Sequence, residues 1–106
     1  MKKLFFLFFI LAPAMIFSQE NVPKYEFRGT WMATVINLDW PQAGGIPVRF
    51  QQDDLISKLN KLDKMGINIV FFQIRTEGDA LYDPPIEPWS KYLTGEEGRA
   101  PDPYWD

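Results

Sequence analysis

After residue 26, the spacing of apolar residues is typical of strands in two segments and of a helix in the segment between them. Residues 27–36 (FRGTWMATVI) are rich in β-branched and aromatic side chains with a period of two, which predicts a strand. Residues 67–74 (INIVFFQI) form a nearly unbroken apolar run, which is typical of a strand covered on both faces in a parallel sheet. Between them, from about Gln51 to Met65, apolar residues recur at helical spacing. The order strand, helix, strand predicts a βαβ unit and hence an α/β fold.

The predicted helix has a recognisable start, apolar stripe and end. Acidic residues lie near its start and lysines towards its end, as the helix dipole favours. Gly66 stands where a left-handed C-cap is expected. The stripe consists of Leu55, Ile56, Leu59, Leu62 and Met65.

Two irregular segments follow the two predicted strands. Residues 37–50 contain two prolines and the Gly44-Gly45 pair, which predicts a long loop. Residues 76–106 contain five prolines and are far longer than an ordinary connection, so no regular structure is expected there. Because both segments leave the carboxyl end of a parallel strand, they should share one face. That face is where α/β proteins place binding and catalytic groups.

The N-terminus has the layout of a secretory signal peptide. Lys2 and Lys3 precede an apolar run at residues 4–17, and polar residues follow from Ser18. The run is shorter than the roughly 20 residues of a spanning helix. We expect cleavage after Ser18, a linker at 19–25 and a secreted or periplasmic protein without a stable membrane span; an uncleaved anchor is the alternative.

The amino-acid composition excludes several classes of catalytic and binding site. The 106 residues include no Cys and no His, which excludes from this chain a thiolate nucleophile, a Ser-His-Asp triad and a Cys-based zinc or redox site. The net charge is −3, and it becomes −5 when Lys2 and Lys3 are removed with the signal peptide. This acidic balance argues against a nucleic-acid partner, which requires a basic patch. No cofactor and no metal site are expected.

The two loops are rich in carboxylates and flat aromatic rings. Aromatic faces pack on the C–H faces of sugars while carboxylates and Arg bind hydroxyls, so this combination suggests a carbohydrate ligand. The candidate substrate-binding residues are Asp39, Trp40, Arg75, Glu77, Asp79 and Trp89.

Each candidate also has a structural interpretation. Arg75 could pair with Asp79 or Glu77 instead of contacting substrate. Asp39 could shape its own loop, and tryptophans in long loops often seal the edge of a core. The residue pattern alone leaves these alternatives open.

Five segments in order resemble the glycosyl hydrolase-like 10 family of bacterial exported proteins. They are FRGxW and NxDWP within residues 27–41, GINxVFFQxR at 66–75, EGDALY at 77–82 and EPWSxYLTG at 87–95. The resemblance covers essentially all of residues 26–106. Thr76 stands where the family usually has Pro, a minor departure.

The resemblance implies a (β/α)₈ barrel of the TIM type, incomplete in this chain, because such a barrel needs roughly 250 residues. It implies a glycoside hydrolase of the cell envelope that acts on polysaccharide, with peptidoglycan glycan strands as a plausible substrate. In related barrels the catalytic carboxylates lie on later strands, so the catalytic residues are expected outside this chain. This N-terminal portion is then inactive alone. The alternatives are a non-catalytic carbohydrate-binding or interaction protein and a nonfunctional remnant.

Overall fold

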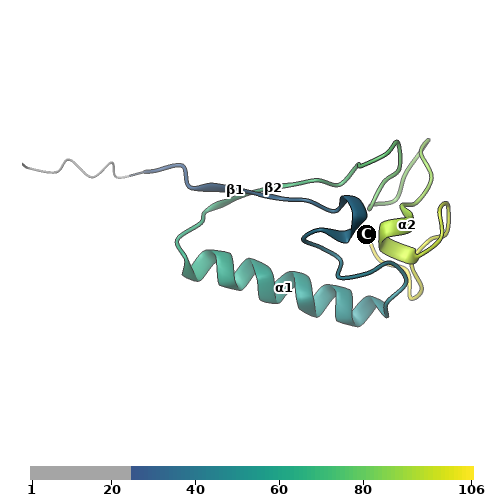
Figure 1. Cartoon of the computed structure of the whole chain (residues 1–106), viewed down its shortest axis with the longest axis horizontal. Helices are drawn as coiled ribbons and strands as arrows, with labels where there is room; N and C mark the ends of the chain where they lie inside the picture. Colours follow the sequence, from purple (N-terminus) through teal and green to yellow (C-terminus); the bar gives the residue numbers. More distant parts are fainter. Residues whose placement is uncertain (1–24) are drawn as a thin grey trace, which may run out of the picture.

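The computed structural model describes residues 25–106; the expected signal peptide lies outside this range. Two short strands, β1 (Gly29–Met32) and β2 (Ile69–Phe72), flank the helix α1 (Val48–Lys64) in the sequence. The strands pair in parallel, with Gly29 opposite Ile69 and Met32 opposite Phe72. Figure 1 shows α1 lying along one side of the strand pair. The predicted βαβ unit and α/β class are confirmed.

Helix α1 starts earlier than predicted. It begins at Val48, after Pro47, so the last residues of the segment expected to be loop are helical. Proline restricts the residue before it and supplies a helical start, but it does not prevent the residues after it from forming a helix. The acidic residues near position 53 therefore lie beyond the first turn.

The predicted C-cap at Gly66 is confirmed. Gly66 has φ +83°, its N–H donates to the Asp63 carbonyl (2.8 Å), and the Ile67 N–H donates to the Leu62 carbonyl (3.0 Å). This pair of bonds is a Schellman motif, which needs a left-handed residue and therefore favours glycine. Lys61 and Lys64 in the last turn complement the helix dipole.

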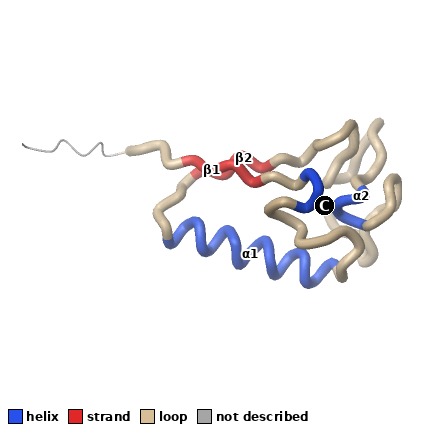
Figure 2. The backbone as a smooth tube through the Cα atoms, viewed as in Figure 1, coloured by secondary structure: helices blue, strands red, loops and turns tan. Residues whose placement is uncertain are grey.

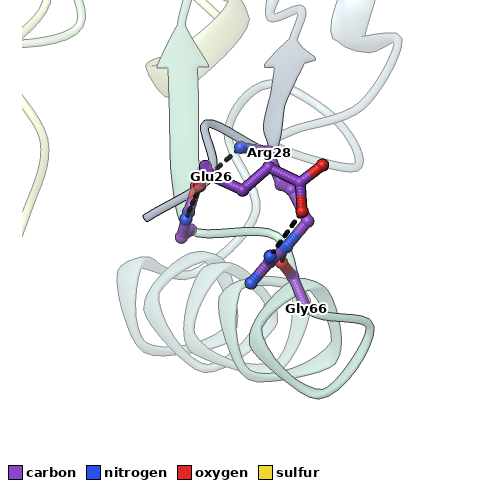
Figure 3. Close-up of polar contacts among 4 residues, drawn as sticks. Glu26, Arg28 and Gly66 are labelled. Carbon is purple, nitrogen blue, oxygen red and sulfur yellow. Dashed lines mark hydrogen bonds and ion pairs between the residues drawn. The ribbon is translucent and has the colours of Figure 1, made fainter. Parts of the chain in front are cut away.

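Arg28 fastens the amino end of the strand pair to the end of the helix. Its guanidinium donates to the Gly66 carbonyl and pairs with Glu26 (3.1 Å), and its backbone N–H donates to the side chain of Asn68 (2.9 Å). Figure 3 shows these contacts at the base of the strands. The turn between α1 and β2 is thus held against the start of β1.

One face of the strand pair is covered and the other is exposed. Met32 is buried, and Val70 and Phe72 pack against the same core on the side of α1. On the opposite face Trp31 is 62 % exposed and Phe71 48 %. The expectation that residues 67–74 are covered on both faces therefore does not hold within the described residues.

Only part of the helical stripe reaches this core. Leu55 and Leu62 pack against it, but Ile56, Leu59 and Met65 are exposed. A pair of strands is narrower than the apolar stripe, so the outer residues of the stripe have no sheet beneath them.

Residues 76–106 contain more regular structure than their prolines predict. Ala80 and Trp89 form an isolated parallel bridge, and a one-turn helix, α2, spans Lys91–Thr94. The buried Ser90 side chain caps α2 by accepting from the Tyr92 N–H (3.2 Å). The first strand ends earlier than predicted: β1 stops at Met32, and η1 (Val35–Asn37), a short 3₁₀ turn whose central residue Ile36 has non-helical φ and ψ, follows it. The expectation that residues 76–106 would lack regular structure was wrong at these points.

The two long segments meet beyond the carboxyl ends of the strands, as predicted (Figure 2). The Asn37 amide donates to the Tyr92 carbonyl (2.8 Å), and the Gly45 N–H donates to the Leu93 carbonyl (3.2 Å). Within residues 25–106 no helix is long and apolar enough to cross a membrane.

Gly44 marks the closest approach of these segments. A Cβ atom there would collide with the Lys91 carbonyl oxygen and lie 3.1 Å from the Cα of Gly95. Both obstacles are backbone atoms, which cannot rotate away as a side chain can. The first loop can therefore pack against the backbone of α2 at this position only because Gly44 has no side chain.

We predict that Gly44→Ala destabilises a protein carrying this segment by about 1–3 kcal/mol, the usual cost of overpacking. Gly78→Ala is the comparison, because Gly78 has φ +79° but open space around it. Its cost should stay near 1 kcal/mol, the cost of a positive φ alone. Urea unfolding measures both variants. Equal or reversed losses would contradict the close approach at Gly44.

Candidate functional site

The candidate site is built at the carboxyl ends of β1 and β2, where a buried threonine ties the two chain segments together. The Thr34 hydroxyl donates to the Gln73 carbonyl (2.6 Å), and the Thr34 N–H donates to the Gln73 side-chain oxygen (3.0 Å). Thr34 has no exposed surface. The two strands therefore leave the sheet in a fixed relative position.

Asp39 shapes the first loop. Its carboxylate accepts from the Ala33 N–H (2.7 Å), and its own N–H donates to the Ala33 carbonyl (2.9 Å). Asp39 is exposed, so part of the carboxylate still faces solvent. The loop-forming role considered from the sequence is present in the structure.

Both candidate tryptophans lie in the core. Trp40 is 1 % exposed, its indole N–H donates to the Gln51 carbonyl (2.8 Å), and its ring packs edge-on against Phe72. Trp89 is 7 % exposed. A buried ring offers no free face to a sugar, so the stacking role expected of these two residues does not fit their positions. They seal the core beneath the loops.

Arg75 pairs with Glu87. The ion pair is partly solvated, with 53 % of the Arg75 side chain and 20 % of the Glu87 side chain exposed. The sequence suggested Asp79 or Glu77 as structural partners, and the structure brings neither of them to Arg75 in an ion pair. The Arg75 guanidinium therefore lies at the surface, just beyond the carboxyl end of β2.

Asp79 is directed into its own loop. It is 4 % exposed and accepts hydrogen bonds from the Thr76 N–H (3.1 Å), the Thr76 hydroxyl (2.6 Å) and the Glu77 N–H (2.9 Å). Burial alone would raise the pKa of Asp79. The hydrogen bonds from Glu77, Ser90 and Thr76 outweigh burial and lower the pKa to about 2. Asp79 is therefore ionised at neutral pH and unsuited to donate a proton.

Glu77 stands on the outside of the same turn. Its carboxylate pairs with Lys91 (3.1 Å), and both side chains are half exposed. The hydrogen bond and the charge of Glu77 raise the pKa of Lys91. A shallow cavity of about 130 Å³ lies here, lined by Glu77, Asp79, Lys91 and Glu97.

These positions divide the six candidates into two groups. Asp39, Trp40, Asp79 and Trp89 hold the loops together, whereas Arg75 and Glu77 present half-exposed charges. Among residues 25–106, no group of three or more acidic side chains is placed to hold a metal ion.

Several residues at the site were missed from the sequence. Gln73 and Thr34 couple the strand ends, and Ser90 caps α2 beside Asp79. The Ser90 position could have been found, since serine is a preferred residue immediately before a helix. Nothing in the local sequence indicates that the Gln73 amide turns towards the first loop.

A parallel βαβ unit with charged loops gathered at the carboxyl ends of its strands defines a protein of the α/β class, with its candidate site at that edge. A family model for glycosyl hydrolase-like 10 proteins matches residues 26–104, and the chain belongs to this family. The resemblance drawn from the sequence segments is confirmed.

Curated relatives that the chain matches are named glycosyl hydrolases. The chain is 40 % identical over 94 residues to glycosyl hydrolase YngK of Bacillus subtilis (strain 168), covering 89 % of this chain. It is 43 % identical over 81 residues to glycosyl hydrolase DigH of Escherichia coli (strain K12), covering 70 % of this chain. The chain spans 18 % of the length of each of these relatives.

We predict that Asp79→Asn lowers the free energy of unfolding at neutral pH by about 2 kcal/mol. This is the free energy that corresponds to lowering the Asp79 pKa from 3.8 to about 2. Because the folded-state pKa lies below the unfolded one, this stabilisation exists above about pH 4 and is lost as the pH falls through about 2. Thermal unfolding of a protein carrying this segment, measured from pH 7 to pH 2, should show the difference shrinking.

Asp63→Asn is the matched control, because Asp63 is exposed on α1. It should change stability by less than about 0.5 kcal/mol at every pH. A pH-independent loss in Asp79→Asn would show that the carboxylate charge is not what stabilises the loop.

Proposed function

We propose that this chain forms the N-terminal part of a (β/α)₈-barrel glycoside hydrolase that acts on polysaccharide, with the glycan strands of peptidoglycan as substrate. Membership of the glycosyl hydrolase-like 10 family is the observation that carries the proposal. The relatives named glycosyl hydrolase agree with it.

The barrel accounts for the uncovered face of the strand pair. In a closed barrel one face of every strand points inward and is filled by side chains, while the other is covered by helices. Trp31 and Phe71 would then belong to the interior, and Met32 to the layer between sheet and helix. The exposed apolar face seen here supports this arrangement.

The half-exposed charges at the strand ends are the proposed substrate contacts. Arg75 and Glu77 would bind sugar hydroxyls, since guanidinium groups donate and carboxylates accept hydrogen bonds. Glu87 would orient the Arg75 guanidinium through their ion pair. Asp39 and Asp79 would support these residues by shaping the loops.

Cleavage itself requires a pair of carboxyl groups, one to protonate the leaving oxygen and one to act as nucleophile or base. Asp79 is held ionised by its hydrogen bonds and is not a candidate for the acid. Because the catalytic carboxylates of related barrels are expected on later strands, we assign the catalytic pair to elements outside residues 25–106 and the role of this segment to substrate positioning.

We predict that Arg75→Ala in a complete protein carrying this segment raises KM for soluble glycan about tenfold, or about 1.4 kcal/mol. Release of reducing ends measures the activity. Stability should fall by less than about 1 kcal/mol, because the ion pair with Glu87 is partly exposed. Arg49→Ala is the control, since Arg49 is an exposed arginine on α1 that pairs with Asp53.

If KM and kcat of Arg75→Ala are unchanged, Arg75 does not contact the substrate. A wild-type protein that binds glycan without releasing reducing ends would instead identify a carbohydrate-binding protein.

Export of the protein is part of the proposal and rests on the N-terminal sequence. Material recovered from outside the cytoplasm should begin at Gln19, because Ser18 precedes the expected cleavage site. Intact-mass measurement checks this. A species that retains residues 1–18 in the membrane would contradict cleavage.

A further inference from the structure

Gln73 directly follows β2 and continues the pairing of the two strands. Its backbone N–H donates to the Met32 carbonyl (2.9 Å), so the parallel ladder extends one residue beyond Phe72. Side chains alternate along a strand, so Gln73 shares a face with Phe71, which is 48 % exposed. This is the face that the proposed barrel would enclose. At the carboxyl end of β2, the Gln73 side chain would therefore lie at the mouth of the barrel.

Hydrogen bonds from the first loop fix the orientation of the Gln73 amide group. The side-chain oxygen Oε1 accepts from the Thr34 N–H (3.0 Å) and from the Val35 N–H (3.3 Å). If the amide were turned over, its NH₂ group would face two backbone N–H donors and leave both without an acceptor. The chain itself therefore determines that the oxygen faces the first loop and that the nitrogen is left for another partner.

The amide nitrogen of Gln73 takes no part in holding the loop. The bonds to Thr34 and Val35 use only the side-chain oxygen and the backbone carbonyl of Gln73, and within residues 25–106 no hydrogen bond uses the nitrogen. Gln73 is half-buried, and its nitrogen is not one of the buried polar atoms that lack a partner in this part of the chain. The nitrogen therefore reaches solvent with two N–H donors available.

We propose that the Gln73 side-chain nitrogen donates a hydrogen bond to an oxygen of the substrate glycan, and that the bonds from Thr34 and Val35 make this position specific for an acceptor. The inference rests on the proposed glycoside hydrolase function. A sugar hydroxyl and the carbonyl of an N-acetyl group can both accept such a bond. Because the amide cannot turn over, a ligand group that only donates would meet a second donor here and lose its hydrogen bond.

The test is Gln73→Glu in a complete protein carrying this segment, at neutral pH, where a carboxylate that accepts two N–H bonds is ionised. One carboxylate oxygen can accept from the same two backbone N–H groups, so the loop keeps its hydrogen bonds. The other oxygen replaces the donor with a charged acceptor. We expect KM and the glycan dissociation constant to rise about tenfold or more. The melting temperature should fall by no more than about 3 °C.

Gln52→Glu is the control. It makes the same chemical change at a half-buried glutamine of α1, outside the candidate site, and it should leave KM unchanged. Oligomers of glucose and of N-acetylglucosamine, equal in length, distinguish the two acceptors. If the acetyl carbonyl is the acceptor, Gln73→Glu weakens binding of the N-acetylated series alone; if a hydroxyl is the acceptor, binding of both series weakens.

The outcomes separate this inference from the proposed function. Cleavage of glycan by the wild type with unchanged KM in Gln73→Glu overturns the Gln73 contact alone. A melting temperature that falls by more than about 3 °C in Gln73→Glu also overturns it, because the nitrogen then donates to a group of the protein. A wild-type protein that neither binds nor cleaves glycan overturns both proposals.

Discussion

The parallel pairing of β1 with β2 is the constraint on which the rest of the structure depends. Two parallel strands cannot be joined by a tight turn, so the chain must cross back along α1 before β2 can pair. Because both strands run in the same direction, both long segments leave at the same end. The contacts from Asn37 and Gly45 to the segment around α2 follow from that geometry.

The core of this unit is made largely by the loops. Of the buried apolar cluster, only Met32 belongs to a strand, while Trp40, Leu81, Trp89 and Leu93 come from the segments beyond the strand ends. Burial of such side chains is the main source of stability, at roughly 1.5–3 kcal/mol for a fully buried Leu or Met. The loops are thus anchored at their own base, which gives the exposed charges above them defined positions.

The order of elements could be predicted from the sequence because it depends on local periodicity. The two strands, the helix and the Gly66 cap each follow from patterns within a few residues. Positions that depend on contacts between distant segments could not be predicted in this way. Gln73 looks like a strand residue until Thr34, 39 positions away, is placed beside it. The Arg75 partner depends in the same way on Glu87, which lies beyond a stretch of prolines and turns.

The two candidate tryptophans show why the sequence could not distinguish a buried aromatic ring from an exposed one. Whether a tryptophan is buried depends on the folded structure, because burial removes the large apolar area of the indole from water. Here Trp40 has a hydrogen-bond partner for its N–H in the Gln51 carbonyl, so it can be buried without losing a polar contact. Arg75 and Glu77 carry charges whose desolvation would cost more than their pairing returns, so they stay at the surface. The charged side chains Arg75 and Glu77 therefore stay exposed near the carboxyl ends of the strands, while the two tryptophans are buried beneath the loops.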